Sequence, residues 1–188
     1  MSRFAFITAL SLVAFALPAF PEPVEQPRDG RVTTARSMVE EFSGSLRSAL
    51  QAAIQEGGLI NGIEVCNTAA PEIAASLNSS SWTISRTSLK VRNPANAPTS
   101  WQETQLAAMA QQPLTNGKPT EIWQTSEIPG EPAFQYMRAI PTGPLCLGCH
   151  GKSIAPGVKA KLAELYPDDQ ATGFSAGDLR GAFVVLSL

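Results

Sequence analysis

The sequence is poor in the residues on which many functions depend. Of its 188 residues, one is a histidine and three are cysteines, and 16% are charged, with a net charge of −2. No run of lysine and arginine is present, so the chain lacks the basic surface that binding of nucleic acid requires. It also lacks an acidic tail and a basic amphipathic stretch, which argues against a role at a membrane surface. The 44% of hydrophobic residues is nevertheless enough for a folded core.

A long apolar run is present only near the beginning of the chain. Arg3 precedes an uncharged run over residues 4–20, and this order is typical of a secretory signal peptide. We therefore expect a signal peptide over residues 1–20, a flexible proline-rich leader over residues 21–31 and one domain over residues 32–188. An uncleaved N-terminal anchor is the alternative, although the run is short for a transmembrane helix, which needs roughly 20 residues.

Export would place the mature chain in the periplasm or an equivalent oxidising compartment. No cysteine lies near the expected cleavage point, which excludes lipid attachment there. No second apolar span follows, so we expect no membrane span in the mature chain unless the N-terminal segment stays uncleaved.

Periodic patterns predict an α+β domain. Apolar residues at spacings of three and four predict a long helix from residue 32 to about residue 53, which Gly57-Gly58 ends. Ser100 and Glu103 have the spacing of a capping box at the start of a later helix. Further expected elements are helices over 71–77, 100–109 and 156–166 and strands over 82–91, 121–127, 133–140 and 181–188. Helices early and antiparallel strands later, without βαβ alternation, favour an α+β fold.

One pentapeptide carries recognisable chemistry. Residues 146–150 read Cys-Leu-Gly-Cys-His, which is the C-x-x-C-H pattern of covalent haem attachment. Two cysteines three positions apart can form thioethers to the two vinyl groups of one porphyrin, and the next residue then lies under the metal. The pattern predicts one c-type haem attached through Cys146 and Cys149, with His150 as the proximal axial ligand.

Two other interpretations use the same cysteines. A Cys146–Cys149 disulfide is compatible with export, but it leaves His150, the single histidine of the chain, without a role. A zinc site completed by Cys66 would require the adjacent residues Cys149 and His150 to point at one metal, which structural four-ligand sites avoid.

The sixth iron ligand is an open question at the level of the residues. One histidine excludes bis-histidine ligation within the chain, so the remaining candidates are Met38, Met109, Met137, a lysine, Cys66 and water. The methionines are more often core residues than ligands. Cys66 has no disulfide partner if the other two cysteines hold haem. It is then either a small buried hydrophobic residue or a thiol protected from oxidation, and iron coordination would protect it.

Two segments resemble a known bacterial family. Residues 66–74, Cys-Asn-Thr-Ala-Ala-Pro-Glu-Ile-Ala, and residues 84–98, Ile-Ser-Arg-Thr-Ser-Leu-Lys-Val-Arg-Asn-Pro-Ala-Asn-Ala-Pro, are similar to the Tll-type c-type haem proteins, first catalogued as a domain of unknown function. The resemblance covers residues 32–188. It implies a PAS-like α+β fold and an unusual Cys/His axial pair in which Cys66 is the distal ligand. Such a thiolate would lower the reduction potential relative to Met/His cytochromes, and its weakening on reduction would allow a ligand switch.

Basic residues near the second segment are candidates for the haem propionates. Arg86, Lys90 and Arg92 alternate along one expected strand and would share a face. Propionates are anionic and commonly meet arginine or lysine, so these three residues are predicted to bind them. Lys152 is a weaker candidate, and a solvated polar face is the alternative. Aromatic residues that would either wall the haem or pack in the core are Trp123, Phe134 and Tyr136.

We therefore expect an exported mono-haem c-type cytochrome that passes single electrons to a redox partner protein of unknown identity. The alternative is a sensor of redox state or of a diatomic gas. The chain contains no kinase, methyl-accepting or DNA-binding segment, so a sensor would act through a separate partner. We expect the protein not to be an enzyme. A peroxidase, for example, needs an open iron position and a distal acid–base residue, typically a second histidine, which this chain lacks.

Overall fold

The computed structural model describes residues 30–187. The signal peptide expected over residues 1–20 and most of the expected leader lie outside the described residues, as does Leu188. In residues 30–187, no helix combines the length and the apolar character that crossing a membrane requires.

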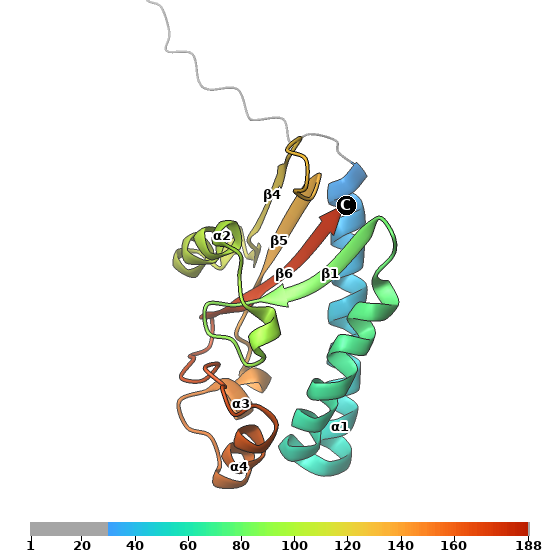
Figure 1. The fold of residues 1–188 in the computed structure, drawn as a ribbon. Helices are drawn as coiled ribbons and strands as arrows, with labels where there is room; N and C mark the ends of the chain where they lie inside the picture. Colours follow the sequence, from blue (N-terminus) through green and yellow to red (C-terminus); the bar gives the residue numbers. More distant parts are fainter. Residues whose placement is uncertain (1–29, 188) are drawn as a thin grey trace, which may run out of the picture.

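The N-terminal helix α1 (Gly30–Leu77) contains a break that divides it into two arms. Gly57 and Gly58 have non-helical backbone angles, and the φ of Gly58, 71°, lies in the left-handed region that glycine adopts without steric cost. The first arm, residues 30–56, and the second arm, residues 59–77, lie side by side as a hairpin (Figure 1). The glycine pair therefore ends the first arm, as the sequence predicted.

The second arm is longer than the sequence pattern predicted. The sequence pattern predicts only a short helix over residues 71–77. In the structure Pro71 lies inside the helix instead. The side-chain amide of Asn61 donates a hydrogen bond to the carbonyl of Ala53 (3.1 Å). This contact between the two arms stabilises the helical residues of the second arm that precede Pro71.

Four strands form an antiparallel sheet in the order β1-β6-β5-β4. They are β1 (Trp82–Thr87), β4 (Glu121–Thr125), β5 (Phe134–Pro141) and β6 (Leu179–Ser187). The first strand ends at Thr87 rather than at residue 91, so the prediction that Lys90 and Arg92 share a strand face with Arg86 is wrong. Ser88 is the physical reason, because its hydroxyl accepts from the backbone N–H of Lys90 (3.1 Å) and turns the chain away from the sheet.

The remaining elements flank this sheet. They are α2 (Ser100–Gln111), α3 (Leu147–His150), α4 (Pro156–Leu165), the 3-10 turns η1 (Pro94–Asn96) and η2 (Pro144–Cys146), and the hairpin β2 (Leu114–Thr115) and β3 (Lys118–Pro119). The capping box of α2 is formed by Thr99 and Gln102, one residue earlier than predicted. The sequence analysis missed the β2-β3 hairpin, although Asn116-Gly117, with φ of 51° and 75°, is a typical hairpin turn.

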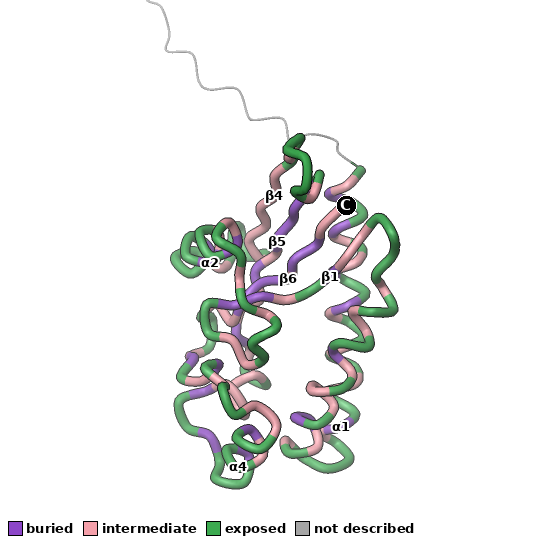
Figure 2. The backbone as a smooth tube through the Cα atoms, viewed as in Figure 1, coloured by how far each residue is buried: buried purple, intermediate pink, exposed green. Residues whose placement is uncertain are grey.

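Two helices cover opposite faces of the sheet. Phe134 and Tyr136 of β5 pack against the first arm of α1, whereas Met137 and Ala139 face α2, as the two-residue period of a strand requires. Figure 2 shows that β5 and β6 are the most deeply buried strands. A separate cluster around Ile63 joins the second arm to α4. This arrangement confirms the predicted PAS-like α+β fold.

Gly181 of β6 is a position where the fold should tolerate no side chain. Its φ is 159°, and a Cβ there would collide with the carbonyl of Thr87 on β1. We expect Gly181→Ala to lower the free energy of unfolding by about 2 kcal/mol, measured by urea denaturation. Gly130→Ala is the matched control, because Gly130 also has a positive φ, 89°, but its Cβ would meet no atom. Equal losses in the two variants would contradict a collision at Gly181.

Candidate functional site

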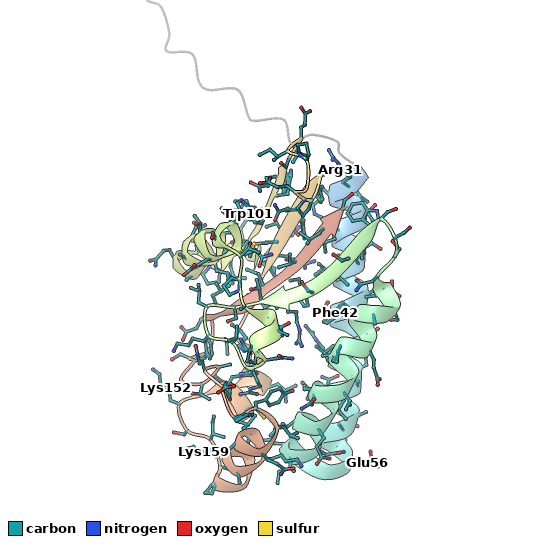
Figure 3. All side chains as sticks on the ribbon, viewed as in Figure 1. Arg31, Phe42, Glu56, Trp101, Lys152 and Lys159 are labelled. Carbon is teal, nitrogen blue, oxygen red and sulfur yellow. The ribbon has the colours of Figure 1, made fainter. Side chains whose placement is uncertain are left out.

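A cavity of about 480 Å³ lies between the α1 hairpin, the end of the sheet and α3. Apolar side chains of the first arm, including Phe42, form one part of the wall, and Figure 3 shows Phe42 between α1 and the sheet. Cys66 from the second arm, Arg86 from β1 and Arg180 from β6 add polar groups. The size falls in the range of cofactor-binding sites, which is roughly 300–1,000 Å³.

The predicted attachment motif lines this cavity. Cys146 ends η2, and Cys149 and His150 end the single turn of α3, so all three side chains belong to the cavity wall. Gly148 allows this placement, because a Cβ there would lie 2.9 Å from Cδ1 of Leu59 on the second arm. The motif is therefore held closely against the helical hairpin.

His150 is oriented by a backbone carbonyl. Its Nδ1 lies 2.7 Å from the carbonyl oxygen of Ala171. Because a carbonyl can only accept, Nδ1 carries the proton, and Nε2 keeps its lone pair. The segment that follows is also held to the motif, since the backbone N–H of Phe174 donates to the carbonyl of His150 (3.0 Å).

Burial, together with nearby positive charge, keeps the ring of His150 neutral. Nε2 lies 3.5 Å from Nη1 of Arg92 and 3.5 Å from Nε of Arg180. Nε of Arg180 also lies 3.1 Å from Nδ1. Because Nδ1 carries a proton, it cannot accept a hydrogen bond from Arg180, which acts there only as a nearby positive charge. Burial first, and then the charges of Arg180 and Arg92, lower the pKa of His150 to about 2. A neutral imidazole with an available Nε2 is the form that ligates metals.

Arg92 and Asp169 support the same segment. Nη2 of Arg92 donates to the carbonyl of Cys149 (2.6 Å) and forms an ion pair with Oδ2 of Asp169 (3.0 Å). Oδ1 of Asp169 accepts from the backbone N–H of Ala171 (2.8 Å), and the carbonyl of Ala171 accepts the hydrogen bond from Nδ1–H of His150. The two side chains are only 13% and 10% exposed. The ion pair thus ties the loop that orients His150 to the motif itself.

Cys66 projects into the cavity from the second arm. Burial raises the pKa of its thiol, while the charges of Arg86 and Arg92 act in the opposite direction. The charge of Cys146 raises the pKa of Cys66, and the charges of Cys66 and Cys146 raise that of Cys149. The three sulfurs therefore share one environment. All three thiols are free.

Other residues considered from the sequence lie elsewhere. Met38, Phe134, Tyr136 and Trp123 pack in or against the core beneath α1, and Met109 and Met137 pack in the core beneath α2. Lys90 is exposed, with Nζ 5.3 Å from the centre of the Phe174 ring. Lys152 lines a separate hollow beside α4 and is labelled in Figure 3.

The structure also bears on metal-binding groups and on Arg180, a residue of the site that was not predicted from the sequence. Among residues 30–187, no group of three or more His, Cys, Asp or Glu side chains is placed to hold a metal ion. The sequence analysis did not single out Arg180, which lines the cavity next to His150. No local pattern marks Arg180, because only the pairing of β6 with β1 brings it to the site.

Comparisons with known proteins identify a family model and a solved structure. The family model described as Tll0287-like (Tll0287) matches residues 24–187. A solved structure, the crystal structure of the cyanobacterial heme-protein Tll0287, is 27% identical in sequence, with a TM-score of 0.62 over 85% of this chain and 95% of that chain. No curated protein matches this chain.

Removing the carboxylate of Asp169 should destabilise the protein strongly. Asp169→Asn leaves the buried cation of Arg92 without its ion-pair partner, which typically costs about 3 kcal/mol or more in the free energy of unfolding. The exposed neighbour Asp168 offers a matched control, and Asp168→Asn should change the same quantity by less than about 0.5 kcal/mol. Urea denaturation of both variants measures the difference. Similar small losses would show that the ion pair does not support the loop.

Proposed function

Because the chain belongs to the Tll0287-like family, we propose that it is an exported mono-haem c-type cytochrome that transfers single electrons. One observation carries the proposal: the C-x-x-C-H segment and Cys66 line the same cavity, from different elements of the fold. The heme-protein of 27% sequence identity supports haem as the cofactor class. Export rests on the signal peptide expected over residues 1–20.

The cavity wall fits covalent attachment of haem. Cys146 and Cys149 are free thiols three positions apart on the η2–α3 turns, and both line the cavity. The S–H of each cysteine would add across one vinyl double bond, which needs no oxidant and releases no leaving group. Apolar residues of the first arm, such as Phe42 and Leu46, would contact the porphyrin and exclude water.

The environment of His150 fits the role of proximal ligand. Its Nδ1–H is bound to the carbonyl of Ala171 at 2.7 Å, and metal-ligating histidines usually donate their other ring N–H in this way. The hydrogen bond fixes the tautomer and the ring orientation and makes Nε2 more basic. His150 would therefore already have the tautomer and the orientation that iron ligation needs when haem binds.

Cys66 is our proposed distal ligand. It lines the same cavity as His150, whereas Met38, Met109 and Met137 pack in the cores above and below the sheet. Iron bound here would supply a one-electron couple. A thiolate ligand stabilises the ferric state, so we expect a low reduction potential.

A sensor of redox state or of a diatomic gas, acting through a separate partner, is the second candidate. The observation that favours it is the extent of the cavity beyond Cys66, because its lining also includes Asn67, Asn78 and Asn96. If Cys66 left the iron on reduction, a small ligand could occupy that space. Catalysis ranks below both, since the single histidine of the chain is assigned to the proximal side.

Replacing Cys66 tests the distal ligand. We expect Cys66→Ser to keep covalent haem and to lose the thiolate character of the ferric absorbance and electron paramagnetic resonance spectra, because a hydroxyl is a weak iron ligand. Met38→Leu, on the first arm, is the control and should leave both spectra unchanged. An unchanged spectrum in Cys66→Ser would exclude Cys66 as ligand.

In Cys149→Ser, mass spectrometry should detect haem held by one thioether at most.

Carbon monoxide separates electron transfer from sensing. Reduced protein should show no change in its absorbance within seconds of exposure to carbon monoxide, because the protein ligand stays on the iron. The same protein should titrate reversibly as a single one-electron couple. Rapid binding of carbon monoxide, with release of Cys66, would instead support the sensor.

A further inference from the structure

Three arginines from separate segments converge on the cavity. Arg86 lies on β1, Arg92 lies in the turn that follows, and Arg180 lies on β6 beside β1. Burial of a cation is costly unless a counter-charge or several hydrogen bonds compensate for the lost water. The counter-charges of these arginines therefore indicate what the cavity is built to bind.

Arg92 has its counter-charge within the protein. Its guanidinium is paired with Asp169 at 3.0 Å and bound to the carbonyl of Cys149 at 2.6 Å. Through these two contacts, Nη2 of Arg92 binds both the motif and the loop that orients His150. Arg92 is therefore a structural cation of the attachment segment.

Arg86 and Arg180 have no such partner. Among residues 30–187, no carboxylate forms an ion pair with either guanidinium. Arg86 lies over the Phe42 ring, 5.5 Å from its centre. Arg180 donates to the neutral oxygens Oγ of Ser88 (3.2 Å) and the carbonyl of Lys90 (3.4 Å).

We propose that Arg86 and Arg180 form a carboxylate-binding subsite of the cavity, and that they bind the two propionates of the haem. This inference rests on the proposed function, since it takes the haem to occupy this cavity. A guanidinium suits the role because it can donate two parallel hydrogen bonds to one carboxylate. The assignment replaces Lys90, which is exposed, with Arg180, and it removes Arg92, which Asp169 already holds.

The assignment also balances charge inside the cavity. In the ferric state, the porphyrin dianion and a thiolate from Cys66 neutralise the iron. The two propionates then remain, and the guanidiniums of Arg86 and Arg180 match them in number and sign. A ligand without carboxylates would leave both arginines partly buried and uncompensated.

The propionate bending bands of the resonance Raman spectrum test the assignment. Attached haem is first quantified in each variant as its pyridine haemochrome, which reports on the proposed function independently. We expect Arg86→Gln and Arg180→Gln each to shift one propionate band, and the double variant to shift both. Both single variants should also have a lower reduction potential, because loss of a nearby cation stabilises ferric iron. Lys159→Gln, an exposed change on α4, is the control and should leave the bands in place.

Three outcomes would overturn the inference. Unchanged bands in Arg86→Gln and Arg180→Gln, with haem attached, would show that the propionates lie elsewhere. A shift in Lys90→Gln alone would place the propionates at Lys90 rather than at Arg86 and Arg180. Absence of haem from the wild-type protein would overturn the proposed function and this inference together. If an arginine variant fails to fold, a crystal structure of the haem-loaded wild-type protein decides directly, by the distance from each guanidinium to a propionate.

Discussion

The site depends first on the hydrogen bond from Nδ1–H of His150 to the carbonyl of Ala171. This bond assigns the proton to Nδ1 and leaves the lone pair of Nε2 free for a metal. It can form only because the segment around Ala171 is held beside the motif, by the Arg92–Asp169 ion pair and by backbone hydrogen bonds to residues 150 and 151. This ion pair matters for the site because it holds the loop whose carbonyl, that of Ala171, the imidazole meets.

The second requirement is the hairpin of α1. The break at Gly57 and Gly58 reverses the chain, so the second arm returns along the first and carries Cys66 to the cavity. Contact between Gly148 and Leu59 then sets the distance between the motif and this arm. A continuous helix would place Cys66 far from the motif, because each residue adds about 1.5 Å along the helix axis. Two glycines thus decide whether a Cys/His pair is available.

Local signals predicted much of the fold but less of the site. The first arm, the sheet strands and α4 follow from apolar periodicity, because each buries one face. Lys90 was placed on the wrong element, since the turn made by the Ser88 hydroxyl has no periodic signature. Asp169 and Arg180 were not recognised at all. Both are ordinary charged residues whose roles come from contacts with residues more than twenty positions away in the chain.

The sequence by itself determined the chemistry that depends on neighbouring residues. Spacing alone predicts that residues 146–150 are a haem-attachment motif, because thioether formation and ligation at adjacent positions need only one turn of backbone. The tertiary structure decided the rest, namely that Cys66 shares the cavity, that Arg92 is paired and that no carboxylate among the described residues pairs with Arg86 or Arg180. The reason is physical. Burial and pairing of a charge depend on what surrounds it in space, and strand order and a helical hairpin bring those surroundings together from distant parts of the chain.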